Sequence, residues 1–214
     1  MKNKLHDYRK LYQKHELLEE EIPQDPFDLF HTWLKAVEES REVEEINTMN
    51  LSTIGLDGFP KTRVVLLKEY DREGFVFYTN YESEKAQAIA KDPRVCLSFF
   101  WPDSERQVLI KGVAQKTSEE ESVDYFRSRP RGSQLGAWAS AQSSIIPSRE
   151  YLEEKMRSLE KEFEGKEIPK PVYWGGYKVI PSQFEFWQGR PSRLHDRIYY
   201  SKEDSGWKMD RLAP

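Results

Sequence analysis

Residues 62–80, TRVVLLKEYDREGFVFYTN, decide the fold class of this chain. Two runs rich in β-branched and aromatic residues flank the polar segment DREG, whose composition is typical of a tight turn. A third such run, INTMNLSTIG at residues 46–55, precedes this pair and is separated from it by a second turn segment, GLDGFPK. Successive strands joined by short turns predict antiparallel hairpins rather than parallel units with crossover helices.

The same pattern returns further along the chain. RVCLSFFW at 94–101 and RQVLIKGVAQK at 106–116 are joined by the turn PDSE, and strands resume from Tyr177 to the C-terminus. Strands in this order, with few crossover helices between them, predict a closed or nearly closed antiparallel barrel. The expected fold class is therefore mainly β with flanking helices.

Helices are predicted at three further places. Asp25 followed by Pro26 is typical of an N-cap and a first helical position, and apolar residues then recur at helical spacing. SEKAQAIAKDP at 83–93 predicts a short helix, and residues 118–164 predict helical segments. No repeat or linker divides the chain, so we expect one domain over 1–214, with a helical N-terminal segment at about 1–22.

Composition excludes several classes of protein. The N-terminus, MKNKLHDYRKLYQKHELLEEE, has no apolar run that could cross a bilayer or act as a secretion signal, so we expect a soluble, cytoplasmic protein. The single cysteine, Cys96, excludes an internal disulfide and argues against structural zinc, and we expect no metal. A net charge of -4 and a pI near 5.7 disfavour a nucleic-acid partner. Any anion site must therefore be local.

The stretch FWQGRPSRLHDR, residues 186–197, concentrates positive charge. If a strand begins here, its period of two places Arg193, His195 and Arg197 on one face, where they repel unless an anion or an acidic partner lies between them. Because guanidinium groups both stack on rings and bind phosphate, a flat anionic ligand fits best. Trp187 is either a wall of that pocket or part of the core.

Three other clusters carry polar chemistry. In RVVLLK at 63–68, two cations, Arg63 and Lys68, end a strand of aliphatic residues, and they are either a pair of solvent-facing edge charges or part of a site. In FYTNYESEK, Ser83 can cap a helix whose N-terminus suits a phosphate. In DYFRSRPRGSQLGAW, residues 124–138, Pro130 ends one helix, so a tyrosine, an arginine and a serine could converge on an anion. A solvated corner between helices is the alternative there.

These segments together resemble the pyridoxine/pyridoxamine 5'-phosphate oxidase family, nearly from end to end. The resemblance rests on the order and spacing of RVVLLK, FYTN, ERQV, YFRSRPRGSQLGAW, QSS, WGG, EFWQG, RLHDR and DRLAP. It implies a Greek-key-like split β-barrel homodimer with FMN at the subunit interface. It also implies oxidation of phosphorylated B6 vitamers to pyridoxal 5'-phosphate by oxygen, with release of hydrogen peroxide. The alternatives are a non-catalytic carrier of flavin or pyridoxal phosphate and an RNA-binding barrel.

The resemblance also assigns roles to residues. The implied FMN contacts are Arg63, Val64, Val65, Leu66, Leu67, Lys68, Tyr78, Thr79, Lys85, Gln107, Gln142, Ser143, Trp187 and Arg197. The implied substrate contacts are Lys68, Tyr125, Arg129 and Ser133 around the phosphate, Arg193 and His195 around the pyridine ring, and Arg9 and Tyr12 on a mobile N-terminal segment. Arg193 and His195 are the implied catalytic residues.

One position departs from the family pattern. The family commonly has arginine between serine and lysine in an S-R-K segment, whereas this chain has Ser83, Glu84 and Lys85. Glu84 either points to solvent and stabilises its own helix or lies near the flavin phosphate and weakens FMN binding.

Overall fold

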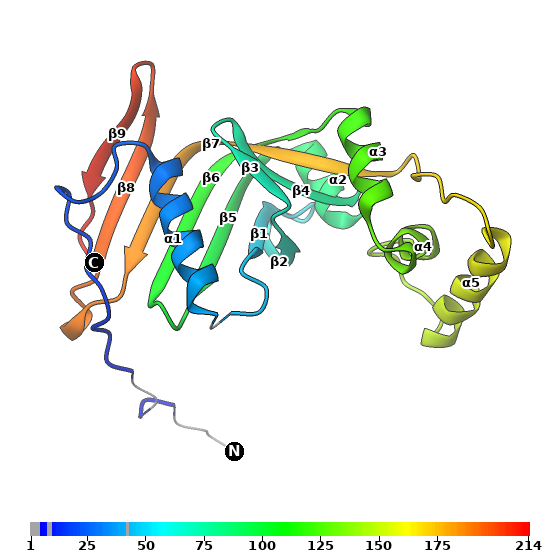
Figure 1. Ribbon diagram of the computed structural model, residues 1–214, viewed down its shortest axis with the longest axis horizontal. Coiled ribbons are helices and arrows are strands. Elements are labelled where there is room, and N and C mark those ends of the chain that lie inside the picture. The colour runs from blue at the N-terminus through cyan, green and yellow to red at the C-terminus, as the bar shows by residue number, and fades with distance from the viewer. Residues whose placement is uncertain (1–4, 8–9, 42) are drawn as a thin grey trace. The chain divides into compact units, whose positions relative to one another are not determined.

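A computed structural model of the protein describes residues 5–7, 10–41 and 43–214. The elements, shown in Figure 1, are α1 (Pro26–Ser40), β1 (Thr48–Ile54), β2 (Pro60–Leu66), β3 (Glu69–Asp71), β4 (Gly74–Asn80), α2 (Glu84–Lys91), β5 (Arg94–Trp101), β6 (Arg106–Lys116), α3 (Glu119–Ser128), α4 (Arg131–Ala139), α5 (Arg149–Glu162), β7 (Trp174–Gln188), a 3-10 turn (Pro191–Arg193), β8 (Asp196–Glu203) and β9 (Gly206–Arg211). The predicted strands and helices are present from α1 onward, except that TRVVLLKEY is divided between β2 and β3.

The strands form one sheet in the order β2-β1-β5-β6-β7-β4-β3, and β8 pairs with both β7 and β9. The long strand β7 organises the functional segments. Its first half pairs antiparallel with β4, which sets Asn80 opposite Trp174, and its second half pairs with β8, which sets Gln188 opposite Asp196. The sheet therefore brings FYTN beside WGG and brings EFWQG beside the start of β8.

The chain forms two compact units, whose segments alternate along the sequence. Unit 1 contains the described residues up to Met49 together with Leu97–Lys111 and Pro181–Pro214, and unit 2 contains Asn50–Cys96 and Gly112–Ile180. The boundaries fall inside β1, β5, β6 and β7. Each unit has its own core and its own polar side-chain clusters.

The core of unit 1 is built on α1, which lies beside β5, β6 and β7 in Figure 1. As predicted, Asp25 caps the helix, because its Oδ1 accepts a hydrogen bond from the Phe27 N–H at 2.8 Å. Phe30 packs edge-on against Phe99 with ring centroids 5.1 Å apart, and Trp33 packs against Phe186 at 5.2 Å. Burial of each large apolar side chain contributes about 1.5–3 kcal/mol, so this face fixes the helix on the sheet.

The prediction of a helical N-terminal segment is wrong for the described residues 10–22, which are irregular with turns. Their backbone groups are used in long-range contacts instead. The N–H groups of Gln13 and Lys14 donate to Oε2 of Glu105 at 2.9 Å and 3.1 Å. Bonds to a carboxylate replace the bonds to carbonyls that a helix would supply, so tertiary contacts override the local tendency.

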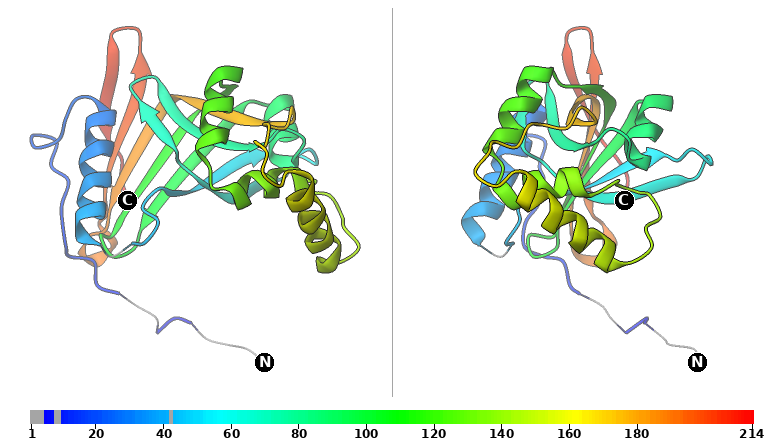
Figure 2. Two further views of the ribbon diagram at one scale, coloured as in Figure 1. Left: turned by 45° about the vertical axis from the view of Figure 1, so that its right-hand side comes forward. Right: turned by 90° about the vertical axis from the view of Figure 1, so that its right-hand side faces the viewer.

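The core of unit 2 holds the corner between α3 and α4. Its buried members are Phe126, Leu135, Ile168 and Trp174, and side chains of α5 pack against it. Figure 2 shows α4 and α5 lying side by side. Because α3, α4 and the start of β7 share this core, their polar side chains have defined positions in unit 2. No helix in the described part of the chain is long and apolar enough to cross a membrane.

Candidate functional site

Unit 2 contains a cavity of about 560 Å³, called the main cavity below. Side chains from β2, β4, the α3–α4 corner and β7 line it. Among the residues predicted for a site, those that line it are Val64, Val65, Leu66, Lys68, Tyr78, Thr79, Lys85, Tyr125, Arg129, Ser133 and Gln142. Leu67 does not line it, because its side chain is buried in the core.

Arg129 lies at the α3–α4 corner, where Pro130 is the N-cap of α4. Its guanidinium carbon lies 4.6 Å from the ring centroid of Trp174. The Nη1 atom is buried and has no hydrogen-bond partner among the described residues. Burial lowers the pKa of Arg129, yet a guanidinium remains charged at neutral pH. An unpaired buried donor costs about 1–3 kcal/mol, so this atom fits an anionic ligand.

Parallel aromatic rings form one wall of the main cavity. The rings of Tyr78 and Tyr125 are stacked with centroids 4.0 Å apart, and Tyr78 and Trp174 are stacked at 5.5 Å. Burial raises the pKa of Tyr78 to about 12, so its phenol stays protonated and can donate a hydrogen bond. A flat wall of this kind suits a planar ligand.

Trp174 is a site residue that the sequence analysis did not assign. The signal was present in the WGG segment, because glycines within a strand often mark a close approach of another group. At Gly176, an added Cβ would lie 2.8 Å from Cε1 of Tyr78 and 2.6 Å from Oγ1 of Thr117. Glycine therefore lets the aromatic wall approach β7.

Lys85 lies at another part of the main cavity and is 9% exposed. Its Nζ donates to Oε1 of Gln142 at 2.9 Å, to Oγ1 of Thr79 at 3.2 Å and to Oγ of Ser83 at 3.3 Å. Burial, followed by the positive charge of Arg63, lowers the pKa of Lys85 to about 8. Within the described part of the chain, no carboxylate lies within 4 Å of this ammonium group. The group therefore fits a bound anion.

The start of α2 differs from the prediction. Ser83 occupies the N-cap position, but its side chain makes no capping bond, because its Oγ donates to the carbonyl oxygen of Asn80 at 2.7 Å. The first helical N–H, that of Glu84, donates instead to Oγ of Ser143 at 3.2 Å. The QSS segment is thereby joined to the helix N-terminus.

A second cavity in unit 2, of about 300 Å³, is called the side cavity below. Its lining residues are Lys61, Thr62, Arg63, Val64, Glu84, Lys85, Gln142 and Ser143. Nη1 of Arg63 donates to the carbonyl oxygen of Leu51 at 2.9 Å and to Oγ1 of Thr53 at 2.9 Å. Glu84 faces this cavity and forms an ion pair with Lys61. Glu84 therefore lines the same cavity as Lys61, Arg63 and Lys85.

In unit 1, the prediction that three cations alternate on one strand face is wrong. Arg193 lies in a 3-10 turn with a left-handed φ of 62°, next to Ser192 with φ 57°, and β8 begins only after His195. Arg197 is within β8, and its Nε pairs with Glu185 at 2.8 Å. The turn after Pro191 interrupts the extended backbone that the alternation required.

Tyr12, Trp187 and His195 form an aromatic cluster in unit 1. Tyr12 lies edge-on to both other rings at centroid distances of 5.7 Å, and Trp187 lies 4.8 Å from His195. Nδ1 of His195 accepts a hydrogen bond from the N–H of Arg190. Burial, followed by the charge of Arg193, lowers the pKa of His195. The structure thus brings together three of the residues predicted from the resemblance.

Gln107, a predicted flavin contact, lies elsewhere in unit 1. The side-chain amide of Gln107 donates to Oγ of Ser98 at 3.3 Å, within unit 1. Arg9 lies outside the described residues.

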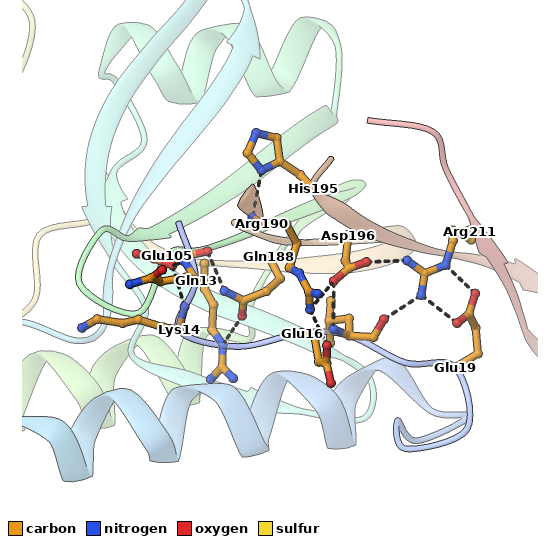
Figure 3. Close-up of polar contacts among 12 residues, drawn as sticks. Gln13, Lys14, Glu16, Glu19, Glu105, Gln188, Arg190, His195, Asp196 and Arg211 are labelled. Atoms are coloured by element: carbon orange, nitrogen blue, oxygen red, sulfur yellow. Dashed lines mark hydrogen bonds and ion pairs between the residues drawn. The ribbon is translucent and has the colours of Figure 1, made fainter. Parts of the chain in front are cut away.

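Hydrogen bonds and ion pairs of carboxylates and arginines hold the N-terminal segment in unit 1 (Figure 3). Arg211 donates to both Glu19, at 2.5 Å, and Asp196, at 2.7 Å. Asp196 also accepts the N–H of Leu17 at 3.1 Å. Sequence reasoning missed this network because Leu17 and Glu19 are separated from Asp196 and Arg211 by most of the chain.

Comparison with known proteins identifies the family. Residues 36–161 match the family model described as pyridoxamine 5'-phosphate oxidase, and residues 174–214 match one described as the pyridoxine 5'-phosphate oxidase C-terminal dimerisation region. A protein of Flavobacterium johnsoniae named pyridoxine/pyridoxamine 5'-phosphate oxidase is 61% identical over 212 residues, covering 99% of each chain. A protein of Christiangramia forsetii with the same name is 56% identical over 214 residues, covering 100% of each.

Solved structures of other proteins resemble the fold of this chain. The crystal structure of PhzG from Burkholderia lata 383, in complex with tetrahydrophenazine-1-carboxylic acid, matches with a TM-score of 0.86 at 27% identity and covers 94% of this chain and 100% of PhzG. A pyridoxamine 5'-phosphate oxidase-related, FMN binding protein from Nostoc punctiforme matches in fold, with a TM-score of 0.68 at 15% identity, covering 86% of this chain and 96% of that one. The predicted class, a mainly β split barrel with flanking helices, is confirmed. With these matches over nearly its whole length, the chain belongs to the pyridoxine/pyridoxamine 5'-phosphate oxidase family of oxidoreductases.

Proposed function

We propose that this protein uses FMN to oxidise pyridoxine 5'-phosphate and pyridoxamine 5'-phosphate to pyridoxal 5'-phosphate in the cytoplasm, for vitamin B6 biosynthesis and salvage. Molecular oxygen accepts the electrons and leaves as hydrogen peroxide. With the amine as substrate, water supplies the aldehyde oxygen and ammonia is released. The observation that carries the proposal is the main cavity, where neither Arg129 nor Lys85 has an anionic partner among residues 5–7, 10–41 and 43–214.

The residues around Lys85 fit the phosphate of FMN. Lys85 and Arg63 supply positive charge, and Gln142 and Ser143 supply polar groups beside them. Among the described residues, the hydrogen-bond partners of the two cations are neutral oxygens, so a phosphate would provide the missing counter-charge. The aromatic wall and the aliphatic side chains of β2 fit the flat ring system of the cofactor.

The residues around Arg129 fit the phosphate of the substrate. Tyr125, Arg129 and Ser133 line the same cavity, and Lys68 lies at its β2 side. Anchoring the phosphate limits the rotation and translation of the pyridine ring, which converts binding energy into orientation of the carbon that is oxidised. When bound, FMN supplies the hydride acceptor and the reactivity with oxygen.

In the proposed homodimer, residues of unit 1 would also contact the cofactor and the substrate. The match of residues 174–214 to a dimerisation region supports this assembly, with FMN at the interface. Trp187 and Arg197 would contact the cofactor, and Arg193 and His195 would contact the pyridine ring. Arg193 stabilises negative charge on the substrate, and the neutral imidazole offers a hydrogen-bond donor. Arg9 and Tyr12 would cover the bound substrate and exclude water.

One spectrum tests this function. Pyridoxine 5'-phosphate is added without oxygen to the flavin-loaded protein, and the flavin absorbance is recorded before and after air is admitted. An oxidase bleaches and then recovers its colour. A carrier keeps its oxidised spectrum, and an RNA-binding barrel is colourless as isolated, so either result overturns the proposal.

A further inference from the structure

The side cavity contains more positive charge than its own contacts neutralise. Within the described part of the chain, Arg63 and Lys85 bond to neutral oxygens only, and the charge of Arg63 contributes to the lowered pKa of Lys85. Of the residues that the structure describes, Glu84 is the single carboxylate that lines this cavity. A carboxylate at this place reduces the attraction of the cavity for any anion.

Lys61 offsets that carboxylate. Its Nζ forms a direct ion pair with Oε1 of Glu84, and its side chain is 53% exposed against 41% for Glu84. The backbone of Lys61 is held as well, because its carbonyl oxygen accepts a hydrogen bond from Nη1 of Arg63 at 2.8 Å. One residue therefore supports Arg63 through its backbone and neutralises Glu84 through its side chain.

The formal charges of the lining residues give a simple balance. Lys61, Arg63 and Lys85 contribute three positive charges and Glu84 one negative charge, which leaves a net charge of two. A phosphate monoester carries a charge of about −1.5 to −2 at neutral pH. Without the Lys61 ammonium, the surplus falls by one charge.

We propose that Lys61 determines the affinity of this protein for phosphorylated flavin, by neutralising Glu84 at the rim of the side cavity. This inference rests on the proposed function, because it assigns the phosphate of FMN to this cavity. The inference concerns the phosphate of the flavin alone. Riboflavin, which has the same ring system without the phosphate, is therefore the control ligand. Neither Lys61 nor Glu84 was among the FMN contacts that the family resemblance implied.

The test is a set of fluorescence titrations of apoprotein with FMN and with riboflavin. The variants are K61Q, E84Q, the double variant K61Q/E84Q, and K35Q, which breaks an exposed ion pair with Glu39 on α1. For an ion pair of this exposure, we expect K61Q to weaken FMN binding by about fivefold. E84Q should bind FMN more tightly than the wild type, and the double variant should return to within about twofold of the wild type because the net charge is restored.

Other results would overturn the inference. Equal FMN affinity in K61Q and wild type would show that the ion pair lies outside the field of the phosphate. A double variant as weak as K61Q would show that Lys61 acts without Glu84. Riboflavin affinity that falls in parallel with FMN affinity would point to a general loss of the flavin site. Wild-type apoprotein that binds neither flavin would instead contradict the proposed function itself.

Discussion

The backbone N–H of Arg190 donates a hydrogen bond to Nδ1 of His195 over 3.1 Å. Because Nδ1 is the acceptor, the neutral imidazole carries its proton on Nε2 and presents a donor there. Burial and the charge of Arg193 lower the pKa of His195, although Asp196 opposes them. At neutral pH the ring is therefore uncharged, with its tautomer set by the turn before β8.

The bond between Arg190 and His195 predicts that both the stability of the protein and its kcat/KM depend on pH. Below the ordinary pKa of 6.5, the unfolded chain takes up a proton before the folded protein does, so the stability contributed by His195 declines as the pH falls. Protonation of Nδ1 also breaks the bond to Arg190. We expect kcat/KM to fall on the acid side, with an apparent pKa below 6.5.

The substrate phosphate titrates near pH 6 as well, so a variant is needed to separate the two groups. H195N keeps an acceptor near the position of Nδ1 and cannot be protonated. Profiles of kcat/KM against pH should show a shallower acid limb in H195N than in the wild type. Superimposable acid limbs would assign the titration to the phosphate.

Replacing Arg193 by alanine should affect catalysis without loss of FMN. Arg193 is exposed in its 3-10 turn, so little packing is lost, and alanine meets the same left-handed backbone strain. We expect kcat/KM to fall by about 10-fold to 1000-fold, from lost positioning and charge stabilisation. Steady-state kinetics normalised to bound flavin measure the effect, with R193K as the charge-preserving control. Unchanged activity per flavin would remove Arg193 from the substrate site.

Arg129 should make the enzyme selective for phosphorylated substrates. Its unpaired Nη1 predicts that phosphate-free pyridoxine reacts far more poorly than pyridoxine 5'-phosphate. R129M keeps much of the packing on Trp174 but removes the charge. We expect it to lower the ratio of kcat/KM for the two substrates by about 10-fold to 100-fold, the range for a hydrogen bond to a charged group. Equal efficiency of the wild type on both substrates would contradict the anchor.

Glu105 should control the order of the N-terminal segment. Its side chain is 2% exposed and receives the N–H groups of Gln13 and Lys14. In E105A, we expect the amides of these two residues to exchange hydrogen faster and the segment to be cleaved earlier in limited proteolysis. E105Q, which keeps one acceptor oxygen, should lie between E105A and the wild type. If exchange at residues 13 and 14 is the same in all three proteins, the carboxylate does not hold the segment.

Replacing Glu84 by arginine should tighten FMN binding. The change removes the carboxylate from the side cavity and adds a cation beside Arg63 and Lys85. At low salt we expect the dissociation constant for FMN to fall by about fivefold, with a smaller effect at high salt because of screening. Fluorescence titration at two salt concentrations measures it. An unchanged constant at low salt would remove position 84 from the flavin site.

The local sequence determined the secondary structure over most of the chain. Apolar periodicity, the Asp25 cap and the turn DREG act over a few residues, and the structure contains the corresponding helix and hairpin. Pro130 likewise predicted the corner that carries Tyr125 and Arg129 to one cavity. These features were predictable because their energies come from neighbouring residues.

Only the tertiary structure decided which distant groups meet. Glu105 binds an amide 92 positions away, and Asp196 binds one 179 positions away, so neither contact leaves a periodic signal in the sequence. The pairing of β4 with β7 likewise brings Trp174 to Tyr78. The same reason explains the irregular backbone after residue 10, where hydrogen bonds to the carboxylates of Glu105 and Asp196 outweigh a weak helical tendency. It also explains the ion pair of Lys61 with Glu84, which forms because residues of β2 and the start of α2 line the same cavity in unit 2.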